Sequence, residues 1–392
     1  MRTPLLMLVS CMVLAVPIAA QQKPPDLTGT LSFDVGSASG RVESLAVQIG
    51  DGGTGRYKAI LAGDPSLPTH AIYRPRDLRP FGAKLLMPIV AFGNGGCRNG
   101  SGEFRNFLSD LASHGYLIVA IGPAGDAVVA GSEGRTNQTQ ASQLLDGVAW
   151  AIRENGRQGS DYFGKIDVGS VAVMGQSCGT RQALEVSGDP RVKTTVLLNG
   201  GPNLGGGRGR GAGPAQTPAA ASAPPPPAGA TGATGGSAQP AAPGESGTAT
   251  APPASMFAAL DKMNRRYAPY APALQPVPSA ASPQAGGERP DYIAALHAPI
   301  ALINGGPKDL AYNGAVSGYE SVQKVTALHA WQDVGHYPAT YRQPNGGAFA
   351  IAVNAWLDWH LKGDQSASKM FLGSNCGLCK DPKWNVQIKN VR

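Results

Sequence analysis

The chain has 392 residues, more than one ordinary domain needs, and it contains 53 glycines and 33 prolines. This composition indicates that part of the chain does not pack. Hydrophobic residues make up 42% and charged residues 15%, so the remainder is long enough to bury a core, which excludes a wholly disordered chain. The formal net charge is +7, but the basic residues form no run and have no interleaved aromatics, which argues against a nucleic-acid partner.

The first 20 residues are typical of a secretory signal peptide. Arg2 supplies a positive charge, residues 5–16 are almost continuously apolar, and residues 18–20 offer a small-residue cleavage site before Gln21. The sequence ending at Cys11 also resembles a lipoprotein box, so lipid attachment is a minor alternative. No later stretch reaches the roughly 18 apolar residues of a membrane span. We therefore expect an exported, periplasmic or extracellular protein without a transmembrane segment.

Short apolar runs alternate with helical patterns along much of the chain. The predicted buried strands cover residues 84–92, 116–121, 168–174, 194–198, 299–303 and 327–333. The predicted helices cover residues 103–114, 138–154, 181–186 and 348–361. This alternation predicts an α/β fold with a mostly parallel sheet and helices on both faces. Two earlier segments, 42–49 and 71–74, are expected to add antiparallel edge strands.

A low-complexity segment interrupts this pattern. Residues 204–255 are almost entirely Gly, Ala, Pro, Ser and Thr, without apolar periodicity. Such a segment cannot bury enough surface to offset its ordering entropy, which predicts a disordered insertion between the sixth and seventh strands. The insertion would divide one domain into residues 21–203 and 256–392. Residues 256–271 are amphipathic and are the candidate for a short ordered cap.

Residues 175–179 read Gly-Gln-Ser-Cys-Gly, a G-x-S-x-G sequence that a glycine-rich chain can also contain by chance. Its position is more informative than its letters, because it follows the β-branched run 171–173 and leads directly into a predicted helix. A strand-turn-helix of this kind presents the central serine on a sharp, exposed turn, and glycines on either side permit close backbone approach. Ser177 is therefore the predicted nucleophile. Cys178 is disfavoured for that role because Ser177 occupies the central position.

A serine nucleophile needs a base and an orienting acid, and both follow the later predicted strands. Asp309 lies in the loop after one strand, and His336 lies in the loop after the next. Since the carboxyl ends of parallel strands meet at one edge, Ser177, Asp309 and His336 are predicted to form a triad. Asp333 is the alternative acid, but we expect it to remain within its strand. The other five histidines fit helix-end, strand or helix positions better.

Attack on an ester carbonyl also requires two backbone N–H donors for the developing oxyanion. Cys178, directly after the nucleophile, is one candidate, and the glycine-rich loop at residues 93–97 offers Gly96 and Cys97. If donors from both segments serve the same oxygen, Cys97 and Cys178 come close together, and we hypothesise a disulfide between them.

The remaining cysteines, Cys376 and Cys379, would then form the second disulfide. Four cysteines allow three pairings, however, and the sequence alone does not choose among them. Their Cys-x-x-Cys spacing also fits half of a zinc site, but no second pair of ligands accompanies it. We expect neither a metal nor a cofactor.

Over residues 83–202 and 297–363 the chain resembles the α/β-hydrolases. The serine turn, the glycine loop, residues 111–116 and the Gly335-His336 step are shared with the secreted dienelactone-hydrolase-like and polyester-hydrolase (cutinase-like) branch. The resemblance implies cofactor-independent cleavage of carboxylic esters through an acyl-serine intermediate. It implies the roles of nucleophile for Ser177, base for His336 and orienting acid for Asp309.

The chain departs from the polyester hydrolases at positions that affect the substrate. Gln176 and Cys178 replace the histidine and methionine that usually flank the serine, and residues 199–201 read Asn-Gly-Gly where a tryptophan is usual. An aromatic clamp for terephthalate-like polymers is therefore not evident. We expect a monomeric serine hydrolase acting on small or medium acyl esters. The alternatives are a polymer or plant-wall ester hydrolase and a non-catalytic α/β-hydrolase-like binding protein.

Overall fold

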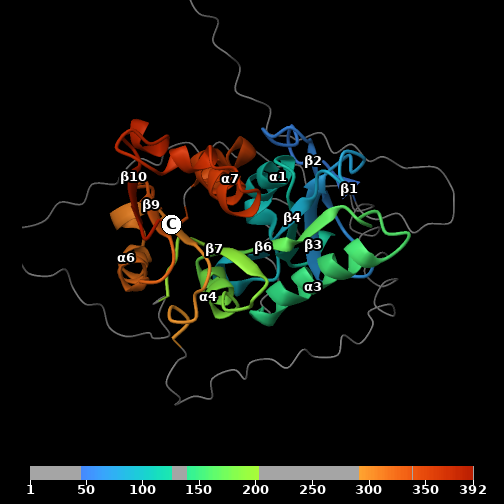
Figure 1. Ribbon diagram of the computed structural model, residues 1–392, viewed down its shortest axis with the longest axis horizontal. Coiled ribbons are helices and arrows are strands. Elements are labelled where there is room, and N and C mark those ends of the chain that lie inside the picture. The colour runs from blue at the N-terminus through green and yellow to red at the C-terminus, as the bar shows by residue number, and fades with distance from the viewer. Residues whose placement is uncertain (1–45, 126–138, 203–290, 338, 392) are drawn as a thin grey trace, which may run out of the picture.

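The computed structural model describes residues 46–125, 139–202, 291–337 and 339–391 (Figure 1). The predicted signal peptide, the low-complexity insertion and the candidate cap lie outside these residues. The described strands are β1 (Ala46–Val47), β2 (Ala59–Ala62), β3 (His70–Pro75), β4 (Met87–Gly93), β5 (Leu117–Ile121), β6 (Ile166–Gln176), β7 (Val192–Leu198), β8 (Ile300–Asn304), β9 (Ala327–Trp331) and β10 (Asn385–Lys389).

All ten strands belong to one sheet, in the order β1-β2-β3-β5-β4-β6-β7-β8-β9-β10. The six central strands, from β5 to β9 in that order, run parallel to one another. The strands β1 to β3 at one edge and β10 at the other pair antiparallel. The prediction of an α/β fold with a mostly parallel sheet is therefore confirmed.

Helices cover both faces of the sheet, and each face has its own apolar core. The described α-helices are α1 (Arg105–Ser113), α3 (Ser142–Gly156), α4 (Cys178–Glu185), α6 (Tyr312–Ser321) and α7 (Gly347–Leu361). In Figure 1, α1 and α7 lie on one side of the sheet and α3 and α4 on the other. Because strand side chains alternate, Val90 and Phe92 pack toward α1 and α7, and Ile89 and Ala91 pack toward α3 and α4.

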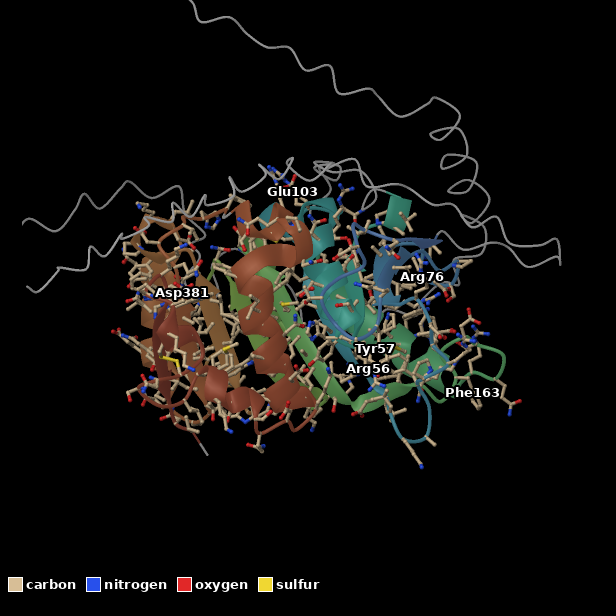
Figure 2. The ribbon with its side chains drawn as sticks, turned by 90° about the horizontal axis from the view of Figure 1, so that it is seen from above. Arg56, Tyr57, Arg76, Glu103, Phe163 and Asp381 are labelled. Atoms are coloured by element: carbon tan, nitrogen blue, oxygen red, sulfur yellow. A yellow bond between two sulfur atoms is a disulfide. The ribbon has the colours of Figure 1, made fainter. Side chains whose placement is uncertain are left out.

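Short 3-10 helices connect these elements around the ends of the strands. They are η1 (Gly95–Cys97), η2 (Gly102–Phe104), η4 (Gly306–Lys308), η5 (Ala339–Arg342), η6 (Pro344–Gly346), η7 (Ala367–Met370) and η8 (Leu378–Lys380). Figure 2 views the molecule from the side on which α7 lies across the sheet. Among the helices of the described residues, none is long and apolar enough to cross a membrane.

The strands and helices predicted for the described residues are present, with ends that differ by a few residues. Three elements were not predicted. Strand β2 has only four residues, all buried, so it lacks the alternation of a half-buried strand, and β10 is a polar edge strand. Helix α6 contains Gly314 and Gly318, which weaken the helical pattern. A Cβ on Gly318 would overlap the Pro202 ring, and Gly201, also after β7, packs against the backbone of Gly314.

Trp356 is the largest side chain joining α7 to the sheet, and it provides a test of this packing. It is fully buried, and its indole N–H donates to Thr194 Oγ1 at 2.8 Å. We expect Trp356→Ala to lower the free energy of unfolding by about 3–5 kcal/mol, measured by urea denaturation. Ile351 on the same helix is 57% exposed, so Ile351→Ala should change it by less than about 0.5 kcal/mol. Equal losses in the two variants would contradict this account of the core.

Candidate active site

Five loops meet at the edge of the sheet where the parallel strands end. The glycine loop follows β4, Ser177 follows β6, and Asn199 follows β7. Asp309 lies five residues after the end of β8, and His336 lies five residues after the end of β9. Parallel strands bring their carboxyl ends to one edge, so residues more than 150 positions apart become neighbours.

Ser177 lies on a sharp turn between β6 and α4. Its φ of 51° is in the region that non-glycine residues rarely adopt. The strained turn is held by the Ser177 N–H, which donates to Leu198 O at 2.8 Å. It also requires close approach of backbone segments, because a Cβ on Gly175 would overlap the carbonyl of Gly179, and a Cβ on Gly179 would overlap the carbonyl of Gly93. The two glycines of the G-x-S-x-G sequence are therefore a geometric requirement of this turn.

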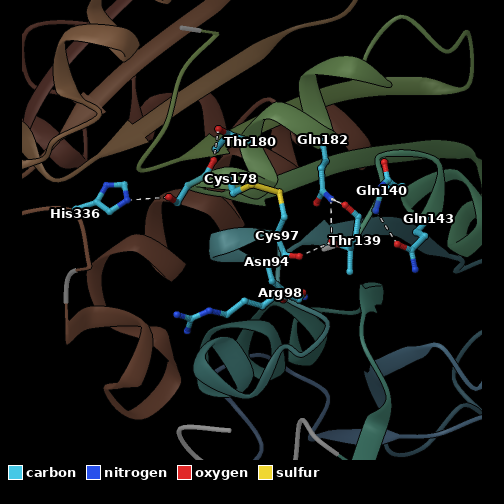
Figure 3. Close-up of a disulfide and its surroundings, with 11 residues drawn as sticks. Asn94, Cys97, Arg98, Thr139, Gln140, Gln143, Cys178, Thr180, Gln182 and His336 are labelled. Atoms are coloured by element: carbon cyan, nitrogen blue, oxygen red, sulfur yellow. Dashed lines mark hydrogen bonds between the residues drawn. A yellow bond between two sulfur atoms is a disulfide. The ribbon is translucent and has the colours of Figure 1, made fainter. Parts of the chain in front are cut away.

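Ser177, His336 and Asp309 form a continuous hydrogen-bonded chain. Ser177 Oγ lies 2.8 Å from His336 Nε2 (Figure 3). His336 Nδ1 lies 2.6 Å from Asp309 Oδ1. A carboxylate can only accept, so Nδ1 carries the imidazole proton and Nε2 is left to accept from the serine hydroxyl. The His336 side chain is 11% exposed and the Asp309 side chain is fully buried. The structure thus brings the three predicted residues together.

Asp309 is buried yet remains a carboxylate. Burial alone raises the pKa of its carboxyl, but four hydrogen bonds to the charged form outweigh this effect, and the pKa is lowered overall. The donors are His336, the Ala311 N–H at 2.8 Å, the Asn199 amide at 2.9 Å and the Gly305 N–H at 3.1 Å. The negative charge next to the imidazole is therefore stable at neutral pH.

Asp333, the alternative acid, lies outside this hydrogen-bonded chain. Strand β9 ends at Trp331, so the prediction that the strand includes Asp333 is wrong. The Asp333 carboxylate instead pairs with Lys308, whose Nζ lies 2.8 Å away and whose backbone N–H donates to it at 3.2 Å. This exposed ion pair joins the loops that follow β8 and β9.

A disulfide joins the glycine loop to the start of the helix that follows Ser177. Cys97 is the last residue of η1, Cys178 is the first residue of α4, and their Cα atoms are 5.1 Å apart (Figure 3). The second disulfide joins Cys376 to Cys379, which excludes the alternative of a half zinc site. Both predicted pairings are therefore confirmed.

The predicted oxyanion donors need one correction. The Cys97 N–H donates to Asn94 O at 3.1 Å within the η1 turn, so it is already used as a donor there. Gly96 remains the predicted candidate from this loop. Cys178 remains the candidate from α4, where the first turn of a helix leaves backbone N–H groups without intrahelical acceptors.

The glycine loop is also held by hydrogen bonds that the sequence did not reveal. Cys97 O accepts from the Thr139 N–H at 2.9 Å and from its hydroxyl at 3.0 Å (Figure 3). Gln182 of α4 in turn donates to Thr139 O at 2.7 Å. The loop and the helix are therefore connected twice, by the disulfide and through Thr139.

Two further polar residues at this edge were missed by the sequence reasoning. Gln176 is fully buried, donates to His336 O at 3.3 Å, and lies where a Cβ on Gly95 would be. Asn199 is fully buried and contacts Asp309. Both residues lie at the carboxyl end of a strand, at the predicted edge of the sheet. A search of the sequence for polar residues at the ends of the predicted strands would have identified them.

Within the described part of the chain, no group of three or more His, Cys, Asp or Glu side chains is placed to hold a metal ion. No protein-family model matches this chain, and a search of curated proteins finds no similar sequence.

The two disulfides should differ in their effect on stability. The 97–178 bond spans a sequence separation of 81 and the 376–379 bond a separation of 3, so the former restricts the unfolded chain far more. We expect the double variant Cys97→Ser/Cys178→Ser to lose about 2–3 kcal/mol more free energy of unfolding than Cys376→Ser/Cys379→Ser. Urea denaturation of the two variants measures this difference, and a larger loss from the 376–379 variant would contradict it.

The lowered pKa of Asp309 predicts a pH-dependent contribution to stability. An acid whose pKa falls on folding stabilises the protein above its unfolded pKa of about 4, and this contribution is lost as the pH falls through the folded pKa. Asp309→Asn should therefore destabilise the protein at neutral pH, and its difference from wild type should shrink below about pH 4. Glu320→Gln is the control at an exposed carboxylate. If the difference in free energy of unfolding between Asp309→Asn and wild type does not change with pH, the assignment of a lowered pKa to Asp309 is refuted.

Proposed function

We propose that this chain is a serine hydrolase of the α/β-hydrolase family that cleaves carboxylic esters. The observation that carries the proposal is the hydrogen-bonded chain from Ser177 through His336 to Asp309 at the carboxyl edge of a parallel sheet. The order Ser, Asp, His along the chain and the strained turn at Ser177 support it, because both are features of this family. A non-catalytic relative would have no need for a strained serine beside a correctly oriented imidazole.

Acylation begins when Ser177 Oγ attacks the ester carbonyl carbon. His336 Nε2 takes the hydroxyl proton as the bond forms, and the Asp309 carboxylate stabilises the resulting imidazolium. The carbonyl oxygen becomes an oxyanion, which the N–H groups of Cys178 and Gly96 are proposed to bind. When the tetrahedral intermediate collapses, His336 gives its proton to the leaving alcohol, and the acyl group stays on Ser177.

Deacylation repeats these steps with water. His336 takes a proton from the water as its oxygen attacks the acyl carbonyl, and the same N–H groups bind the second oxyanion. Collapse of this intermediate breaks the ester bond to Ser177. His336 returns the proton to Ser177 Oγ, and the carboxylic acid leaves.

The surroundings of the proposed triad favour an apolar ester and an oxidising compartment. Tyr337, whose ring lies 4.8 Å from the His336 ring, is 62% exposed. Leu310 and Val334, within two residues of Asp309 and His336 in the sequence, are 75% and 47% exposed. Apolar side chains at the rim of a site bind apolar parts of a substrate.

Two disulfides are typical of exported proteins, which supports secretion to the periplasm or the extracellular space.

The proposal predicts that Ser177→Ala abolishes turnover of soluble p-nitrophenyl esters without unfolding the protein. Removing the nucleophile of a serine hydrolase lowers kcat by about 10⁵–10⁶-fold, because no acyl intermediate can form. Ser187→Ala is the matched control, since the Ser187 hydroxyl is also hydrogen-bonded, donating to Leu184 O at 2.6 Å, near the opposite end of α4. It should leave kcat unchanged.

Two measurements complete the test. A fluorophosphonate should label the wild type and Ser187→Ala at Ser177 and should not label Ser177→Ala. A panel of p-nitrophenyl esters of increasing acyl length then identifies the preferred substrate. Wild-type rates in Ser177→Ala, or a folded wild type that neither turns over these esters nor reacts with the fluorophosphonate, would refute the proposed function.

A further inference from the structure

A buried polar pair, Asn199 and Tyr341, bonds to the Asp309 carboxylate through Oδ2, the oxygen that does not contact His336. The Asn199 side-chain amide donates to Asp309 Oδ2 at 2.9 Å and to Gly335 O at 3.3 Å. The Tyr341 hydroxyl donates to Asn199 Oδ1 at 2.6 Å. Asn199 is fully buried and Tyr341 is 3% exposed, so solvent water does not compete for these bonds. The hydrogen-bonded chain therefore continues beyond the acid to a tyrosine.

The Tyr341 hydroxyl determines which way the Asn199 amide faces. The amide oxygen can only accept and the amide nitrogen can only donate, so a bond from Tyr341 to Oδ1 directs the NH₂ group toward the Asp309 carboxylate. The reversed amide would place its oxygen against carboxylate Oδ2, which is repulsive, and would leave the Tyr341 O–H without its acceptor on Asn199. In a buried site both mismatches are costly. Tyr341 therefore fixes the donor that Asp309 needs.

Both members of the pair are themselves held in place. The Tyr341 ring lies edge-on to three aromatic rings, those of Phe104, Phe107 and Phe349, with centroids 5.2, 5.4 and 5.7 Å away. Asn199 has a φ of 48°, which asparagine tolerates better than most residues, and its N–H donates to Ile303 O at 2.9 Å. Ring packing therefore holds the Tyr341 hydroxyl in place, and a backbone hydrogen bond to β8 holds Asn199 in place.

The bonds of Asn199 reach both loops of the proposed triad. One amide hydrogen holds Asp309 Oδ2, which leaves Oδ1 directed toward His336 Nδ1. The other amide hydrogen holds the carbonyl of Gly335, the residue directly before His336. A change in the orientation of this amide would therefore disturb both the carboxylate and the backbone that carries the imidazole.

We propose that Asn199 and Tyr341 are positioning residues of the hydrolase site, with Tyr341 orienting the Asn199 amide and the amide orienting Asp309 and the His336 loop. This inference rests on the proposed function, because the residue they position is its orienting acid. Their side chains bond to Asp309, to Gly335 and to each other, so their effect reaches Ser177 through Asp309 and His336.

The first test uses Tyr341→Phe and Asn199→Leu, with p-nitrophenyl ester turnover as the assay. Tyr341→Phe removes only the hydroxyl, and we expect kcat to fall about tenfold with KM changed by less than about twofold. Asn199→Leu removes the donor to the charged Asp309 carboxylate and the donor to Gly335 O, and it should lower kcat by about 10–100-fold. The double variant should be no worse than Asn199→Leu, because Tyr341 acts through Asn199.

Tyr116→Phe is the matched control for loss of a buried hydroxyl. Tyr116 is also buried and donates to a side chain, Asp358 Oδ1, at 2.7 Å. It directly precedes β5, at the amino end of a parallel strand and so at the edge opposite the proposed site. The kcat of Tyr116→Phe should equal the wild-type value, even if the melting temperature of this variant falls as far as that of Tyr341→Phe.

A second test asks whether Tyr341 acts through the acid. In an Asp309→Ala background, adding Tyr341→Phe should not lower kcat further. The same fold-loss of kcat in both backgrounds would overturn the proposal, because it would mean that the hydroxyl acts independently of Asp309. Wild-type kcat in both Tyr341→Phe and Asn199→Leu would overturn it as well.

A spectroscopic readout separates this proposal from the proposed function. The His336 Nδ1 proton, bound to the Asp309 carboxylate, should give a far-downfield proton NMR signal that His336→Ala removes. Tyr341→Phe should shift or broaden this signal, and Tyr116→Phe should not. An unchanged signal in Tyr341→Phe would overturn the positioning role even where turnover depends on Ser177. A changed signal in a protein without such turnover would refute only the proposed function.

Discussion

The site depends on one packing constraint, the direct contact of backbone with backbone where β4, β6 and α4 meet. Gly175, Gly179 and Gly93 approach so closely that a Cβ on Gly175 or Gly179 would overlap a backbone carbonyl. This contact lets the chain reverse sharply at Ser177 and brings the start of α4 beside the glycine loop. The Cys97–Cys178 disulfide then joins two segments that packing has already brought together.

A second backbone contact positions the other two residues of the proposed triad. The Gly305 carbonyl accepts from the N–H groups of Val334 and Gly335, at 3.0 and 2.9 Å, so the loops after β8 and β9 are joined as if the strands continued. A Cβ on Gly305 would overlap the Gly335 backbone, so this approach also needs glycine. Because backbone hydrogen bonds join the two loops, the separation of acid and base is set by backbone geometry.

The sequence predicted the parts of the site that follow from local patterns and from sheet topology. Ser177, Asp309 and His336 could be found because each follows a recognisable apolar strand, and parallel strands share an edge. Helix α6 was missed because glycines interrupt its pattern. Gly318 is needed for a tertiary contact with Pro202, after β7, which local periodicity does not express. Asn199 was missed for a related reason, since its role depends on Tyr341, which lies 142 positions away.

The hydrogen bonds around Asp309 resolve a conflict between burial and charge. A fully buried carboxyl favours its neutral form, which would hold the imidazole poorly, whereas an exposed one would be free to turn. The chain surrounds the carboxylate with donors from β7, β8, α6 and β9 connections, so it is both charged and fixed in direction. Two of these donors are backbone N–H groups, which the fold holds by itself. The side-chain amide of Asn199 can rotate, so it is the donor that needs a partner such as Tyr341 to hold it.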